Sequence, residues 1–195
     1  MNQTDIIDFF DKMAEHWDEQ TIRRESAICD ILDKGGVVSG AKVLDIGCGT
    51  GVLFADYIKR DVASVLGVDI SKDMLKHAKA NYNDSRITLL CENAETMVLD
   101  EKFDCIMVHN AFPHFMHPEM LLKNLSSFLA PNGRLTVAHS LSRAEIDKCH
   151  EGKAHSISLK LPSETELASI FQKFVTVDVA ISDDEKYIVS GYKTT

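Results

Sequence analysis

The chain of 195 residues is long enough for one domain with a substantial core, since single cores commonly span roughly 100–200 residues. Its composition, 45% hydrophobic and 26% charged without a biased tract, predicts an ordered globular protein and argues against a repeat array or a disordered chain. The formal net charge of −9 repels phosphate backbones, so nucleic acid is not an expected partner.

The first residues do not resemble an export signal. Five of the first 18 residues are acidic, whereas a secretory signal has a basic start followed by an apolar run. No stretch approaches the roughly 20 apolar residues that span a bilayer, and the five cysteines contain no Cys-x-x-Cys pair. We therefore expect a cytoplasmic protein with reduced thiols and no membrane contact.

Apolar residues recur at helical spacing between residues 4 and 33, and this periodicity predicts two helices that dock on the rest of the domain. The apolar positions are Ile6, Phe9, Phe10, Met13, Trp17, Ile22, Ala27, Ile28, Ile31 and Leu32. We expect residues 1–35 to form a helical segment ahead of a core at 41–195.

From residue 41 onward, continuous apolar runs alternate with helix-like stretches, which is typical of β–α–β units around a parallel sheet buried on both faces. Strands are expected at residues 42–46, 64–68, 87–91, 103–108 and 134–138, and helices at about 52–60, 72–82, 118–129 and 163–173. The final runs, 174–181 and 186–193, flank the polar sequence Ser-Asp-Asp-Glu and predict an antiparallel hairpin. The sequence thus predicts one α/β domain with a seven-stranded, mostly parallel sheet, helices on both faces and a C-terminal antiparallel hairpin.

The first predicted strand runs into three alternate glycines, in the sequence Asp45-Ile-Gly47-Cys-Gly49-Thr-Gly51. Glycine at these positions allows a sharp turn and brings backbone N–H groups within reach of a ligand. We give Cys48, which lies inside this glycine turn, a packing role.

A second acid, Asp69, lies where the next strand ends and a helix begins. A carboxylate there can accept hydrogen bonds from both ribose hydroxyls of a bound nucleoside. Dinucleotide dehydrogenases share this arrangement, but their turn follows Gly-x-Gly-x-x-Gly, whereas this chain has Gly-x-Gly-x-Gly and no second domain. The spacing therefore disfavours a dehydrogenase.

Together these features resemble the class I, Rossmann-like S-adenosylmethionine-dependent methyltransferases, and the resemblance covers most of the chain. Asn93-Ala94 stands where that family usually has Asp-Ala, and residues 130–135 resemble its Leu-Pro-Gly-Gly turn. The resemblance implies S-adenosyl-L-methionine as the cofactor. The binding residues it implies are Asp45, Gly47, Cys48, Gly49 and Gly51 near the methionine part, Asp69 at the ribose, and Ile70, Asn93 and Ala94 at the adenine.

The N-terminal patterns Phe9-Phe-Asp and Ala14-Glu-His-Trp17-Asp resemble those of the small-molecule methyltransferases of quinone biosynthesis. In such proteins this segment folds over the cofactor, which implies that residues 1–35 are a lid. The same aromatic residues could instead be the buried face of an amphipathic helix, and one helix can serve both purposes.

Six of the eight histidines fall between residues 109 and 155. Two of them, His109 and His139, directly follow the fourth and fifth strands, and ligands of open α/β sheets bind beyond such strand ends. Residues 140–160 form a longer and more polar connection than a turn requires, so we treat them as a rim insertion that carries function. The expected catalytic residues are His109, His139 and His150, His109 also touching the cofactor, and the expected acceptor pocket contains Trp17, Asn110, His114, Ser140 and Arg143.

Three roles stay open for these histidines. One could be a general base for the accepting atom, since its pKa lies near neutrality. A set drawn from His109, His114, His139, His150, Asp147 and Cys149 could hold a divalent metal ion. They could also be ordinary polar loop residues, and because no His-x-His or His-Glu-x-x-His pattern occurs, we assign no metal.

The sequence therefore predicts an S-adenosylmethionine-dependent methyltransferase that acts on a small-molecule acceptor. In-line methyl transfer needs positioning and no covalent protein nucleophile. A non-catalytic module that binds S-adenosylmethionine or S-adenosylhomocysteine and a metal-assisted methyltransferase stay open as alternatives. The acceptor and the oligomeric state, for which a homodimer is one option, do not follow from the sequence.

Overall fold

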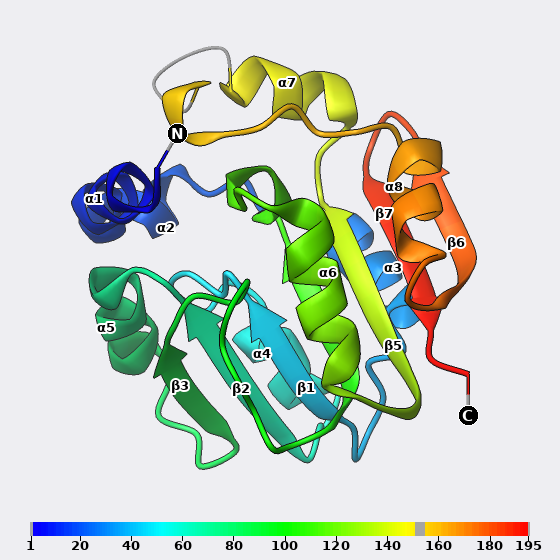
Figure 1. Cartoon of the computed structure of the whole chain (residues 1–195). Helices are drawn as coiled ribbons and strands as arrows, with labels where there is room; N and C mark the ends of the chain where they lie inside the picture. Colours follow the sequence, from blue (N-terminus) through cyan, green and yellow to red (C-terminus); the bar gives the residue numbers. More distant parts are fainter. Residues whose placement is uncertain (1, 151–154, 195) are drawn as a thin grey trace.

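The computed structural model of the protein describes residues 2–150 and 155–194, except for the side chains of His150 and His155 (Figure 1). Within these residues, seven strands form one sheet in the order β3-β2-β1-β4-β5-β7-β6. The strands are β1 (Lys42–Ile46), β2 (Ser64–Asp69), β3 (Ile87–Cys91), β4 (Phe103–His109), β5 (Leu129–His139), β6 (Thr176–Ser182) and β7 (Tyr187–Tyr192). The α-helices are α1 (Gln3–Met13), α2 (Trp17–Gln20), α3 (Glu25–Lys34), α4 (Phe54–Lys59), α5 (Lys72–Asn81), α6 (Pro118–Ser127), α7 (Arg143–His150) and α8 (Glu164–Phe171), and 3₁₀ helices span Ala14–His16, Phe112–His114 and His155–Ile157.

All strands except β7 share one direction. β1 pairs in parallel with β2 and β4, β2 with β3, and β4 with β5. β7 lies between β5 and β6 and runs antiparallel to both. The predicted Rossmann-like, mostly parallel sheet with a C-terminal antiparallel hairpin is therefore confirmed.

Helices cover both faces of the sheet because its central strands are apolar on both sides. On one face, α3 and α4 bury side chains such as Ile31 and Phe54 against the sheet. On the other face, α6 and α8 bury side chains such as Leu122 and Phe171. Figure 1 shows α6 and α8 in front of the sheet and α3 and α4 behind it.

Several element boundaries differ from the predicted ones by one or two residues, and the starts of α4 and β5 differ for a clear structural reason. α4 begins at Phe54, because the glycine turn continues as turns up to residue 53. β5 begins at Leu129, which pairs with Phe103, and the parallel register resumes only at Arg134. Residues 130–133 thus bulge out between the two paired parts, so the predicted turn interrupts β5 rather than preceding it.

The N-terminal segment forms three α-helices where two were expected. α3 packs into the core, whereas α1 and α2 lie beyond the carboxyl ends of the parallel strands (Figure 1). α7 and the 3₁₀ helix His155–Ile157 lie over the same end of the sheet, within the predicted insertion at 140–160. In the described part of the chain, no helix combines the length and the apolarity that crossing a bilayer requires.

Candidate functional site

A cavity opens at the carboxyl ends of β1, β2 and β4, beside the point where the strand order reverses between β1 and β4. It encloses about 1080 Å³, counting the open space at its mouth. Its floor is formed by the glycine turn and the strand ends, and its roof comes from Ile6 and Phe10 of α1 and Trp17 of α2. We refer to it as the central cavity.

The three glycines of the turn all have positive φ, with +66° at Gly47, +55° at Gly49 and +88° at Gly51. A side chain at Gly47 is excluded, because a Cβ there would lie 2.6 Å from the Cβ of Ala111. At Gly49 a Cβ would meet only the indole nitrogen of Trp17, at 3.8 Å, so this stretch of backbone is open to a ligand. Gly51 does not line the cavity, and its N–H closes the turn instead.

Asp45 lies beneath the glycine turn at the end of β1 and is only 2% exposed. Burial raises the pKa of its carboxyl to about 8; the Tyr57 hydroxyl opposes this rise, and the negative charge of Asp69 adds to it. A cationic group in the central cavity would favour the ionised form of Asp45. Cys48 is buried beside it, as expected of a packing residue.

Asp69 ends β2 on the other side of the glycine turn. One carboxylate oxygen accepts a hydrogen bond from the Gly49 N–H and the other from the Ser71 N–H, each at 2.9 Å. Burial raises the pKa of Asp69, and the N–H donors of Ser71 and Gly49 oppose that rise. Each oxygen keeps a lone pair that can accept a hydroxyl of a ligand.

Ile70, Asn93 and Ala94 line one end of the central cavity. The Asn93 side chain is partly engaged, because Oδ1 accepts from the Glu95 N–H at 2.9 Å and Nδ2 donates to Gln3 at 3.3 Å. Its amide oxygen keeps one acceptor position for a ligand amino group. The three residues that the motif predicts at the adenine therefore lie along the same wall of the cavity.

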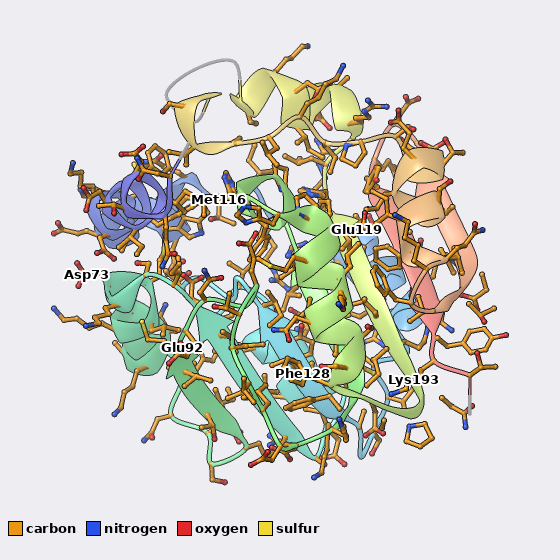
Figure 2. The ribbon with its side chains drawn as sticks, viewed as in Figure 1. Asp73, Glu92, Met116, Glu119, Phe128 and Lys193 are labelled. Atoms are coloured by element: carbon orange, nitrogen blue, oxygen red, sulfur yellow. The ribbon has the colours of Figure 1, made fainter. Side chains whose placement is uncertain are left out.

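Two carboxylates that the sequence analysis did not single out, Glu92 and Glu95, also line the central cavity. Glu92 lies at the end of β3 (Figure 2), and Glu95 is only 5% exposed. Glu95 accepts from the backbone N–H of His117 at 2.6 Å and lies 3.1 Å from its ring nitrogen Nδ1, so it anchors the loop before α6. Their position directly after the third strand is the one signal that could have indicated them.

His109 ends β4 on the same sheet face as Asp45, since Asp45 pairs with Met107, two positions earlier. Its imidazole is 7% exposed, and Nε2 has no hydrogen-bond partner among the described residues. Burial lowers the pKa of His109 to about 4, and the positive charge of Arg23 adds to the shift. The ring is therefore neutral at pH 7, with an unused nitrogen in the wall of the cavity.

His139 and Arg143 do not line the central cavity, which corrects the expectation that both face it. The sheet register gives the reason for His139. His109 pairs with Ala138, so His139 lies one position further and faces the opposite side of the sheet. There its ring packs edge-on against Tyr187, with the centroids 6.0 Å apart. Arg143 lies in α7, beyond the end of β5.

Asn110 lines the central cavity and also joins the ends of β4 and β5. It has a left-handed φ of +53°. Its Oδ1 accepts from the Ser140 N–H at 3.0 Å, and its Nδ2 donates to the Ser140 hydroxyl at 3.2 Å. Ser140 itself is buried and is not part of the wall, so it supports Asn110 instead of contacting the acceptor space.

An aromatic cluster in the roof brings together Phe10, Trp17 and His114, all of which line the cavity. Phe10 lies edge-on to Trp17, with ring centroids 5.6 Å apart, and to His114, at 4.9 Å. Nδ1 of His114 lies 3.1 Å from the Ile157 carbonyl oxygen and 3.2 Å from the Ser158 hydroxyl. The end of the 140–160 insertion therefore holds a roof residue in place without itself lining the cavity.

Two aspartates attach the roof to the floor. Asp18 accepts a hydrogen bond from the hydroxyl of Thr50, in the glycine turn, and another from Asn81 at 3.0 Å. Asp11 accepts from the hydroxyl of Ser71 at 2.5 Å, and Ser71 is the N-cap of α5. Sequence reasoning missed both roles, and only the place of these aspartates beside the N-terminal aromatic residues could have suggested them.

The metal alternative rested on His109, His114, His139 and His150. In the part of the chain that the structure describes, no group of three or more His, Cys, Asp or Glu side chains is arranged to hold a metal ion. His109 and His139 face opposite sides of the sheet. The side chain of His150 lies outside the described residues, so its expected catalytic role stays a prediction.

Comparison with known proteins gives one matching family and a set of relatives. Residues 43–133, which include the glycine turn and Asp69, match the family described as methyltransferase domain. A ubiquinone biosynthesis O-methyltransferase of Coxiella burnetii is 32% identical over 101 residues. That match covers 50% of this chain and 43% of the relative, so the chain spans less than half the length of that protein.

Solved methyltransferase structures are similar over nearly the whole chain. A chain of the complex between the Haloferax volcanii Trm112 methyltransferase activator and a methyltransferase has a TM-score of 0.81 at 18% identity, covering 98% of this chain and 97% of its own length. The N-methyltransferase NodS of Bradyrhizobium japonicum, solved with S-adenosyl-L-homocysteine, has a TM-score of 0.76 at 13% identity, covering 97% of this chain and 99% of its own length. At these identities the likeness concerns the fold.

Proposed function

We propose that the chain is a class I, Rossmann-like S-adenosylmethionine-dependent methyltransferase and that it transfers the methyl group of that cofactor to a small-molecule acceptor. One observation carries the proposal: the glycine turn, the acid that ends β2 and a buried neutral histidine converge on a single cavity. Methyl transfer from a sulfonium is an in-line displacement, so the alignment of two ligands in one cavity is its main requirement.

The floor of the cavity fits the methionine part of S-adenosylmethionine. The backbone at Gly49 faces open space, and the carboxyl groups of Asp45 and Asp69 line the cavity close to it. When bound, the cofactor supplies an electrophilic methyl carbon on a positively charged sulfur. We propose that Gly47, Cys48 and Gly49 contact it through their backbone, and that Asp45 ionises in response to its positive charge.

The ribose and adenine positions follow along the same floor. Asp69 would accept the ribose hydroxyls through the lone pairs that Gly49 and Ser71 leave unused. Ile70 and Ala94 supply apolar contact for the adenine, and the amide oxygen of Asn93 supplies one acceptor.

We assign the proton transfer to His109. It is neutral at pH 7, nine-tenths buried, and carries a ring nitrogen without a partner among the described residues. As the acceptor atom bonds to the methyl carbon, its proton would pass to this nitrogen. His139 faces away from the cavity, which weakens its candidacy as the base.

The N-terminal segment acts in this proposal as the lid. Phe10 and Trp17 roof the cavity, and Asp11 and Asp18 bond to residues of the floor. A roof held in this way would exclude water from the reacting atoms. The lid therefore has to open for the cofactor to enter.

The test is a screen of small-molecule acceptors with methyl-labelled S-adenosylmethionine, run with and without a chelator, beside calorimetry of cofactor binding. Label transfer that is insensitive to the chelator supports the proposal, and transfer lost with the chelator supports the metal-assisted alternative. Cofactor binding without transfer to any acceptor supports a binding module. If neither S-adenosylmethionine nor S-adenosylhomocysteine binds, the methyltransferase assignment is refuted. The homodimer is a separate prediction, which sedimentation analysis would test.

A further inference from the structure

Carboxyl groups line the central cavity without a lysine or arginine beside them in the described part of its wall, and Asp45 is mostly protonated near pH 7 when no cation is bound. The acidic residues in its wall are Asp45, Asp69, Glu92 and Glu95, and among residues 2–150 and 155–194 no lysine or arginine lines it. A carboxylate or phosphate group on the acceptor molecule would therefore lose its hydration without gaining a lysine or arginine partner from the described wall. Repulsion from the carboxylates would add to that cost.

Arg23, the arginine whose charge acts on the cavity, forms its hydrogen bonds with other residues of the protein. Arg23 is close enough to lower the pKa of His109, yet it does not line the wall. Its guanidinium donates to the Val52 carbonyl oxygen at 2.6 Å, to Asp56 at 2.6 Å and to Glu25 at 2.6 Å. Because all three guanidinium nitrogens already donate to these acceptors and the charge is paired with Glu25 and Asp56, Arg23 offers little to an anionic acceptor molecule.

The part of the cavity left over after the cofactor residues has an aromatic and apolar stretch of wall beside polar side chains such as Thr21 and Asn110. Phe10, Trp17 and His114 line it from the roof, and Phe115 and Met116 line it from the loop before α6. Figure 2 shows Met116 in that loop, between α1 and α6. Such walls favour a flat ring that packs against aromatic edges and faces. We name these five residues the acceptor end.

We propose that the acceptor is a ring compound that bears an uncharged hydroxyl, thiol or amino group and no carboxylate, phosphate or sulfate group. This inference rests on the proposed function and narrows its substrate class. The accepting atom forms a bond to the methyl carbon, and the electron pair of the broken carbon–sulfur bond stays on sulfur, which becomes a neutral thioether. The proton of the accepting group passes to neutral His109, which becomes an imidazolium.

Trp17 makes the proposal testable by binding alone. It is the single tryptophan of the chain, and it lines the acceptor end, so its fluorescence reports on that place. Catechol and 3,4-dihydroxybenzoate differ by one carboxylate, and each is titrated into protein saturated with S-adenosylhomocysteine, with calorimetry for the affinity. We expect catechol to change Trp17 fluorescence and the benzoate to bind at least about 10-fold more weakly.

The outcomes separate this inference from the proposed function. Equal or tighter binding of 3,4-dihydroxybenzoate overturns the exclusion of anions. Failure of both ring compounds to bind the S-adenosylhomocysteine complex overturns the ring assignment. Failure of S-adenosylhomocysteine itself to bind overturns the proposed function, and this inference with it.

A positive charge added at the acceptor end should reduce the preference of the protein for catechol over 3,4-dihydroxybenzoate. Met116→Lys is expected to narrow the affinity ratio between catechol and 3,4-dihydroxybenzoate by about 10-fold, because the new ammonium pairs with the carboxylate. Met120→Lys is the matched control, since Met120 is 40% exposed on α6 and lies outside the cavity wall. If the affinity ratio narrows equally in both variants, the cause is a general charge effect. That result would refute the assignment of these five residues as the place where the acceptor binds. If Met116→Lys fails to fold, the two-ligand comparison in the unmodified protein decides alone.

Discussion

The buried residues Asp45 and His109 give the protein without cofactor two opposite dependences on pH. Asp45 has a pKa of about 8 against an ordinary 3.8, so its stabilising contribution is complete below pH 3.8 and is lost as pH rises through 8. His109 has a pKa of about 4 against an ordinary 6.5, so its contribution is present above pH 6.5 and is lost as pH falls through 4. A substitution that removes the Asp45 carboxyl should therefore abolish the loss of stability toward high pH and leave only the loss toward low pH that is due to His109.

The size of the effect follows from these values. Between pH 4 and 6.5 the two slopes oppose each other and nearly cancel, because the folded chain holds a proton on Asp45 while the unfolded chain gains one on His109. From pH 6.5 to 8 only Asp45 contributes, and about 1.5 pH units at about 1.4 kcal/mol each gives a loss of about 2 kcal/mol. Asp45→Asn keeps the shape of the side chain and removes its titration.

The assay is urea unfolding of both proteins, without cofactor, at pH 4.5, 6.5 and 8.0. We expect the unmodified protein to lose about 2 kcal/mol of unfolding free energy from pH 6.5 to 8.0 relative to Asp45→Asn. Below pH 6.5 the variant alone should lose stability, through His109. Asp69, whose pKa burial also raises, adds its slope to both proteins, so the difference between them is the measured quantity. Parallel stability curves for the two proteins would refute the reasoning.

Three further predictions concern single side chains. Asp69→Ala should weaken S-adenosylmethionine binding in calorimetry by about 1–3 kcal/mol, because the ribose hydroxyls lose their acceptor, and unchanged affinity would reject the ribose role. His109→Gln should lower kcat by about 10²- to 10⁴-fold and flatten the pH–rate profile, and a variant with full activity would exclude His109 as the base. Gly47→Ala should lower the unfolding free energy by about 2–3 kcal/mol in urea, since its Cβ meets Ala111 at 2.6 Å. Gly40→Ala is its control: Gly40 has φ +79° but open space around its Cβ, so strain alone should cost about 1 kcal/mol, and equal losses would contradict the steric argument.

Most of the fold could be predicted because its signals are local. Continuous apolar runs mark strands that are buried on both faces, and the Ser163 capping box marks the start of α8. The hairpin followed from the polar break before Tyr187. The failures have physical reasons as well: the start of α4 depends on how far the positive-φ glycines extend the turn, and the start of β5 depends on a pairing of Leu129 with a distant strand.

The floor of the site could be predicted for the same reason, and the roof only in part: Trp17 and His114 were expected at the acceptor pocket and do line the cavity, whereas the hydrogen bonds that hold the roof were not foreseen. Asp45 and Asp69 stand directly at strand ends, where topology alone brings residues together. Asp18 reaches the hydroxyl of Thr50 across 32 positions, and Glu95 reaches His117 across 22. Contacts of this kind depend on how a helix docks, and no periodicity in the sequence encodes the docking.

The histidines at the ends of β4 and β5 show what could not be predicted from the sequence alone. His109 and His139 both close a parallel strand, so the rule that ligands bind at carboxyl ends treats them alike. The register separates them: His109 pairs with Ala138, so successive positions send His109 to the face of Asp45 and His139 to the face of Tyr187. A shift of one residue in the pairing of β4 with β5 would instead pair His109 with His139 and put both rings on the same face of the sheet. Because that register is set by the packing of whole strands, the choice between two equally placed histidines belongs to the fold and not to any local motif.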